Sequence, residues 1–192
     1  MKKITSILLS STLALTLIGC GAETPKPEEA DFRCRIDGSL APEWTCGNSM
    51  IADTITSVGS APLSKLGQNF SRTEAMSNGR SNLALQIETL VKTKVEQFAR
   101  STGVGAAEVA DKVSTQVSKN VAKVTLQGSK QMKFWQNPAN QDIYVLVGLP
   151  EGNVNAAVKD QVKTSFKNDE ALWQQFQSKN ALESLEAEFP TN

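Results

Sequence analysis

Three cysteines are the side chains of this 192-residue chain with the clearest potential for chemistry. Cys20 ends an apolar run, and Cys34 and Cys46 bound the segment CRIDGSLAPEWTC. The chain has no histidine, so the Ser-His-Asp and Cys-His systems that activate a nucleophile are absent. The open question is therefore whether each sulfur carries an attached group, forms a disulfide or binds a metal.

The residues before Cys20 have the form of a secretory signal peptide. Lys2 and Lys3 follow Met1, and the uncharged, mostly apolar run at 4–18 is shorter than the roughly 20 residues that cross a bilayer. The sequence Leu17-Ile18-Gly19-Cys20 resembles the lipobox of bacterial lipoproteins. This resemblance implies cleavage of residues 1–19, a diacylglycerol on the Cys20 sulfur and an acyl chain such as palmitate on its amino group. The alternative is an ordinary signal peptide that happens to be cut near Cys20.

The position after Cys20 bears on the membrane that the anchor would enter. Asp at this position favours retention in the inner membrane in enteric-type bacteria. Gly21 is not acidic and resembles the sorting signal of lipoproteins that reach the outer membrane. We therefore expect an outer-membrane protein, lipid-anchored and facing the periplasm or the cell surface. Residues 20–33 contain two prolines and a glutamate cluster, which predicts a flexible tether after the lipidated cysteine.

An exported chain enters an oxidising compartment, which makes a Cys34–Cys46 disulfide the default interpretation. A metal site is the sharper alternative, but the chain has no histidine and no second CxxC pair. Asp37-Gly38 supplies turn residues within the loop that the disulfide would close. We expect no metal and no cofactor besides the covalent lipid on Cys20.

Charge and motif content disfavour several function classes. The full chain has 20 basic and 20 acidic residues, and removal of residues 1–19 takes away two lysines and leaves 18 basic residues. This balance gives no electrostatic footprint for nucleic acid. The segment TGVGAAE lacks the preceding strand that a dinucleotide site requires. The carboxylate pairs lie in polar stretches, so we expect no catalytic residue and no enzymatic activity.

Hydrophobic periodicity outlines the elements of the folded part. The long helix should begin with a capping box at Ser71 and Glu74, bury Leu90 in its core face and use Gly79 for close packing. The predicted elements are a strand at 53–61, a long helix at 71–100, a shorter helix from 106, a strand at 121–134 bulged at Gly128, a buried strand at 143–149, a helix from 150 and a helical segment at 169–189.

This order predicts an α+β fold, with a small antiparallel sheet, helices packed on one face and an added C-terminal amphipathic helix. The division that we expect is a signal peptide at 1–19, a lipidated tether at 20–33, an α+β domain at 34–168 and a helical extension at 169–192.

The C-terminal segment is the best candidate for protein contacts. Its apolar stripe must be buried, either on its own domain or on another subunit. The second possibility predicts self-association or an envelope protein partner through Leu172, Trp173, Phe176, Leu185 and Phe189.

The segments APEWTC, SVGSA, FSRTEAMSNGRSNLALQIETLVK, TLQGSK and FWQNPANQDIYVLVGL occur in the order and at the spacing of a known family. From about residue 42 to 162 the chain resembles the Lpp-twenty family of small bacterial lipoproteins, which includes the flagellar lipoprotein FlgP. The resemblance implies a structural or protein-interaction role in the cell envelope, with scaffolding of the flagellar motor as its most specific form. The alternative is a monomeric binding module for a small ligand, glycan or peptide.

Overall fold

The computed structural model describes residues 31–191, and from Arg33 onward they form one compact unit. The strands are β1 (Arg35–Ile36), β2 (Ser39–Leu40), β3 (Thr54–Ala61), β4 (Lys130–Gln136) and β5 (Ile143–Pro150). The helices are α1 (Gln68–Thr102), α2 (Ala107–Thr125), α3 (Glu151–Lys167), α4 (Glu170–Ser178) and α5 (Ala181–Glu188), with short 3₁₀ turns η1 (Glu43–Cys46) and η2 (Leu126–Gly128). The α+β prediction is confirmed.

The main sheet has the order β3-β5-β4, and all of its neighbours are antiparallel. β5 lies in the centre, and its apolar run is buried as the sequence predicted. β4 and β5 form the expected hairpin, closed by the turn at 137–142. β3 pairs with β5 along its whole length, from Thr54 opposite Pro150 to Ala61 opposite Ile143.

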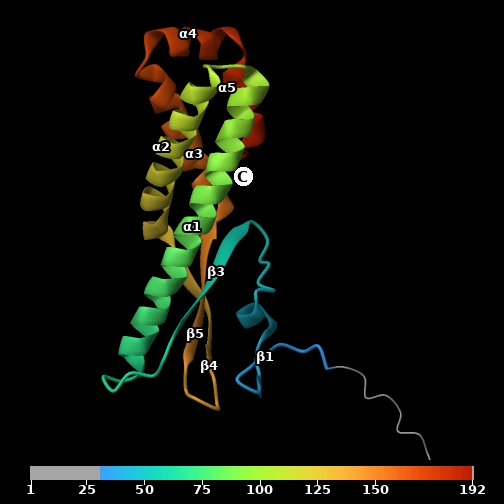
Figure 1. The fold of residues 1–192 in the computed structure, drawn as a ribbon, viewed down its shortest axis with the longest axis vertical. Coiled ribbons are helices and arrows are strands. Elements are labelled where there is room, and N and C mark those ends of the chain that lie inside the picture. The colour runs from blue at the N-terminus through green and yellow to red at the C-terminus, as the bar shows by residue number, and fades with distance from the viewer. Residues whose placement is uncertain (1–30, 192) are drawn as a thin grey trace, which may run out of the picture. The chain divides into compact units, whose positions relative to one another are not determined.

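Helix α1 connects the sheet to the rest of the helices. Its 35 residues span about 52 Å, whereas an eight-residue strand spans about 26 Å. The first half of α1 therefore covers one face of the sheet, and the second half continues past the sheet and packs against α2, α3 and α5 (Figure 1). Its core stripe is Ala75, Gly79, Leu83, Ile87, Val91, Val95 and Phe98.

Two glycines bring α1 into backbone contact with β3. A Cβ on Gly59 would lie 2.1 Å from the Ala75 carbonyl oxygen and 2.2 Å from the Gly79 nitrogen. A Cβ on Gly79 would lie 2.6 Å from Val147 Cγ2. The close packing predicted at Gly79 is confirmed, and its partner is the glycine of the facing strand.

The start of α1 and one of its predicted core residues differ from expectation. The helix begins at Gln68, so Ser71 lies inside its first turn, and its hydroxyl accepts a hydrogen bond from the Ser64 N–H at 2.7 Å. The predicted capping box is therefore wrong. The prediction that Leu90 lies in the core is also wrong, because its side chain faces partly to solvent.

The prediction of a strand over 121–134 is wrong for its first part, because residues up to Gly128 are helical. α2 continues to Thr125 because Val117, Val121 and Thr125 follow one another at a spacing of four and are all buried. The exposed Val124 gave the apparent alternation. The strand begins only at Lys130, and its irregular step lies between residues 131 and 133 rather than at Gly128.

Helices α3 to α5 complete the core. The predicted stripe of α3 is fully buried, and it consists of Val154, Val158, Val162 and Phe166. The last predicted helical segment is two helices, α4 and α5, which pack on each other, with α4 against α3 and α5 against α1. Within residues 31–191, no helix combines the length and apolar character needed to cross a bilayer.

Candidate functional site

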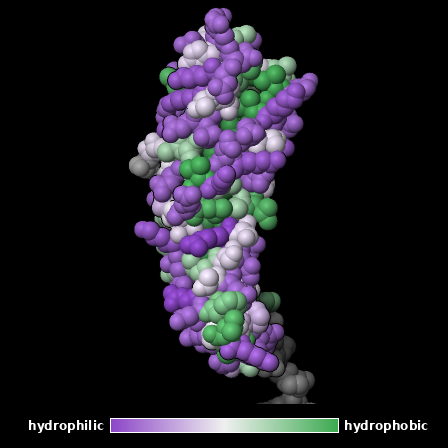
Figure 2. Space-filling view, turned by 90° about the vertical axis from the view of Figure 1, so that its left-hand side faces the viewer, coloured by the Kyte–Doolittle hydropathy of each residue, from purple (hydrophilic) through white to green (hydrophobic). Residues whose placement is uncertain are grey.

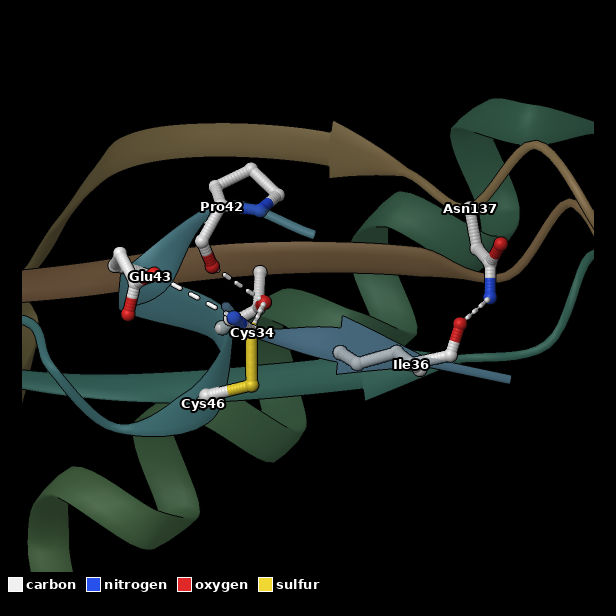
Figure 3. Close-up of a disulfide and its surroundings, with 7 residues drawn as sticks. Cys34, Ile36, Pro42, Glu43, Cys46 and Asn137 are labelled. Carbon is white, nitrogen blue, oxygen red and sulfur yellow. Dashed lines mark hydrogen bonds between the residues drawn. A yellow bond between two sulfur atoms is a disulfide. The ribbon is translucent and has the colours of Figure 1, made fainter. Parts of the chain in front are cut away.

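The cysteine pair closes a small hairpin at the start of the folded unit. Cys34 and Cys46 form a disulfide, as predicted, with their Cα atoms 6.0 Å apart. Between them, Asp37 and Gly38 make a two-residue turn with φ angles of 49° and 79° that joins β1 to β2. Asp-Gly suits this turn because both positions need positive φ. The η1 turn that follows is held by the Thr45 hydroxyl, which donates to the Pro42 carbonyl at 2.7 Å (Figure 3).

The hairpin is fastened to the turn between β4 and β5. Asn137 is completely buried, and its amide donates to the Ile36 carbonyl at 3.5 Å and to the Asp37 carboxylate at 3.3 Å. Asn140 donates to the same carboxylate at 2.9 Å. Burial, and then the negative charges of Asp142 and Asp37, raise the pKa of Tyr144 above its ordinary value. The hairpin thus holds a fixed position at this end of the sheet.

A hollow of about 540 Å³ lies between this hairpin, β3 and α1. The disulfide forms part of its wall, and most of the other side chains around it are polar. The lining residues are Thr45, Cys46, Gly47, Ser49, Thr56, Ser57, Val58, Asn82, Leu85 and Gln86. Thr56 donates to the Ser49 carbonyl at 2.8 Å, which ties one rim to the strand. A hollow lined by hydroxyl and amide groups can bind a polar ligand.

Helix α1 also exposes apolar side chains beside this hollow. Leu85 is 65% exposed and Leu90 is 38% exposed. Together with Gln86, Thr89 and Thr93 they line a shallow groove on the solvent side of the helix. The sequence did not indicate this groove, because Leu90 fits the helical spacing of the core residues and was predicted to be buried.

The C-terminal residues predicted to contact a partner lie on their own unit. Phe176, Leu185 and Phe189 are buried, and Leu172 and Trp173 are half-buried against the same core. The Trp173 ring stacks on Phe176 with centroids 5.2 Å apart. The apolar stripe is therefore used within the chain, which is the first of the two arrangements that the sequence left open.

An ion pair and a hydrogen bond that join α3 to the C-terminal residues were not predicted. Lys159 is buried and donates to the Glu186 carboxylate and, at 3.0 Å, to the Thr191 hydroxyl. Hydrogen bonds from Lys159 and then Lys163 lower the pKa of Glu186. A lysine on the apolar side of a helix was the available signal, but its partner lies 27 residues away in sequence.

Other predicted features lie outside the described residues, namely Cys20, the signal peptide at 1–19 and the tether up to residue 30. Between residues 31 and 191, no group of three or more Cys, Asp or Glu side chains is placed to hold a metal ion.

Comparison with known proteins identifies the family. A family model described as LPP20 lipoprotein matches residues 42–150, which is more than half of the chain. The match begins just before the η1 turn and ends with β5, so it covers the main sheet, α1 and α2. It confirms the resemblance inferred from the order of the sequence segments. Among curated proteins, no match to the chain is found.

Proposed function

Because the chain belongs to the LPP20 lipoprotein family, we propose that it is an outer-membrane lipoprotein with a structural or protein-interaction role in the cell envelope and no enzymatic activity. The family match is the observation that carries this proposal. The lipobox that ends at Cys20 supplies the anchor, and Gly21 supplies the outer-membrane address.

The exposed groove of α1 supports a protein-interaction role. Leu85 is mostly exposed and Leu90 partly exposed, on a helix whose opposite side is fully packed. Apolar side chains gathered on a surface are typical of protein contacts. The partner is a second copy or another envelope protein, and the flagellar motor is the most specific assembly that the family suggests.

Lipidation is tested by the mass of the N-terminal peptide and by incorporation of labelled palmitate. We expect both signals in the natural chain and neither in Cys20→Ser. Fractionation of the envelope then tests the outer-membrane location. An unmodified Cys20 would refute the anchor.

Association is tested by crosslinking the lipidated protein in mild detergent. We expect crosslinked species that weaken in Leu85→Ser and persist in Leu182→Ser, because Leu182 is also exposed but lies on α5, away from the groove. A chain that stays monomeric at high concentration and crosslinks to no partner would contradict the interaction role. Loss of swimming in a deletion strain that still assembles flagella would support the flagellar form of the proposal.

The hollow beside the disulfide favours a second candidate function, the binding of a small ligand, glycan or peptide. Its largely polar lining is the supporting observation. Screening of glycans and peptides by thermal shift tests this function, with Gln86→Ala as the variant that removes a wall residue. Stabilisation that is lost in Gln86→Ala would support it, and the absence of any stabilising ligand would count against it.

A further inference from the structure

Three apolar side chains are exposed in the loop from β3 to α1 and in the first turn of α1. Leu63, Leu66 and Phe70, here called the end-loop patch, are 44%, 75% and 43% exposed. The loop backbone is nevertheless fixed: the Ser64 N–H donates to the buried Ser71 hydroxyl at 2.7 Å, and the Gly67 N–H donates to the Ser64 carbonyl at 3.0 Å. The patch is therefore presented to the outside by an ordered turn.

This loop lies at the end of the unit where the N-terminal segment enters. Gln68 of α1 donates to Gln136 of β4 at 3.0 Å, next to the β4–β5 turn. The β1–β2 hairpin is bonded to the same turn through Asn140 and Asp37. The start of α1, the β4–β5 turn and the hairpin that begins at Cys34 consequently share one end, the lower end in Figure 1. A patch of hydrophobic residues is also visible at the lower end of the face in Figure 2.

The length of the segment between Cys20 and Cys34 limits how far the folded unit can lie from a lipid on Cys20. Residues 21–33 reach at most about 45 Å when fully extended. A lipid on Cys20 therefore holds the start of the unit within about 45 Å of the bilayer, which gives this end a high local concentration at the surface.

Lys65 and the start of α1 provide local positive charge beside the patch. Lys65 stands between two of its leucines and is exposed. α1 begins beside it with Gly67 as N-cap, with no side-chain cap and no acidic residue in its first turn, so the positive end of the helix faces outward. Asp37 and Asp142 accept hydrogen bonds from Asn140, and Glu74 follows Phe70 by one turn of α1, so Lys65 and the start of the helix are the positive features of a surface of mixed charge.

We propose that the end-loop patch docks on the lipid headgroup surface and thereby fixes which end of the unit faces the membrane. The inference rests on the proposed lipid anchor at Cys20. The anchor supplies the affinity, and the patch adds the second, weaker contact that orients the protein. The groove around Leu85 then lies about 25 Å along α1 from the docked end, where it is open to a protein partner.

The test uses the full lipidated chain in vesicles of phosphatidylethanolamine and phosphatidylglycerol. A fluorescent label is attached to Leu66→Cys, or to Leu85→Cys as the matched control. Leu85 is similarly exposed but lies about 25 Å along α1 from its first residue. Quenching is measured with a lipid-borne and with a water-soluble quencher. Mass spectrometry of the same samples establishes the state of Cys20.

We expect the lipid-borne quencher to act more strongly at position 66 than at position 85, and the water-soluble quencher to show the reverse order. Equal water access at both positions on a lipidated chain would overturn the docking inference and leave the anchor intact. Protection of position 66 from both quenchers would indicate a protein occupant and would also overturn it. An unmodified Cys20 would overturn the anchor and the inference together.

Discussion

Replacement of Gly59 by alanine should be among the most damaging small changes in this chain. The added Cβ would lie 2.1 Å from the Ala75 carbonyl oxygen and 2.2 Å from the Gly79 nitrogen, and both are backbone atoms of α1. No rotamer change relieves such a clash between backbone atoms and a Cβ, so α1 must move away from the sheet. Overpacking that side chains can absorb costs about 1–3 kcal/mol. We expect Gly59→Ala to exceed this range and to lower the free energy of unfolding by more than about 3 kcal/mol.

Gly79→Ala provides the matched comparison on the other side of the same contact. Its Cβ would meet chiefly Val147 Cγ2 at 2.6 Å, while the nearest backbone atom, the Gly59 nitrogen, is 3.3 Å away. A side chain can shift, and alanine in place of glycine favours a helix by about 1 kcal/mol. The net loss should therefore be smaller, about 0–2 kcal/mol. Val147→Ala should cost less in the Gly79→Ala background than in the natural chain, because it removes the clashing methyl group.

Urea unfolding followed by circular dichroism measures these differences, with the midpoint and slope fitted for each variant. At this chain length, 3 kcal/mol corresponds to a fall in Tm of about 6–12 °C. The reasoning would be refuted if Gly59→Ala were as stable as the natural chain, or if Gly79→Ala cost more than Gly59→Ala.

Three further changes test other parts of the structure. Reduction of the Cys34–Cys46 disulfide should lower the free energy of unfolding by about 3 kcal/mol, measured from unfolding curves with and without reductant. Phe176→Ala should cost about 3–5 kcal/mol, whereas Leu182→Ala on the exposed side of α5 should change little; equal effects in thermal unfolding would contradict the packing. Because the folded-state pKa of Glu186 is lowered, its contribution is complete above the ordinary carboxylate value of 4.5 and is lost as the pH falls through the lowered value. Acid titration of stability should show this loss, and Glu186→Gln should remove it.

Local sequence signals predicted the parts of the fold that depend on neighbouring residues. The apolar run of β5, the stripe of α3 and the Asp37-Gly38 turn each carry their information within a few residues. The extent of α2 was missed because the exposed Val124 imitated a strand pattern, and helix continuation was decided by burial of Val121 and Thr125 against the rest of the core.

Long-range arrangements could not be predicted from periodicity. The disulfide was expected, but nothing in the sequence indicated that Asn137 would fasten the hairpin to a turn about 100 residues away. The apolar stripe ending at Phe189 was recognised, although its partner could have been the same chain or another subunit. An apolar stripe predicts that one side of a helix is buried. The surface against which it is buried is known only from the three-dimensional structure.

The protection of the β3 edge limits how the protein can associate. β3 has a free edge, and such edges readily pair with a strand of another chain. Here the outward carbonyls of Val58 and Ser60 accept hydrogen bonds from Asn82 at 3.0 Å and from Asn78 at 2.8 Å, both on α1. Because α1 occupies these acceptors, strand addition at this edge would require two hydrogen bonds to break and the helix side chains to move. We therefore expect contacts with a second copy or another envelope protein to use side-chain surfaces, such as the groove that contains Leu85.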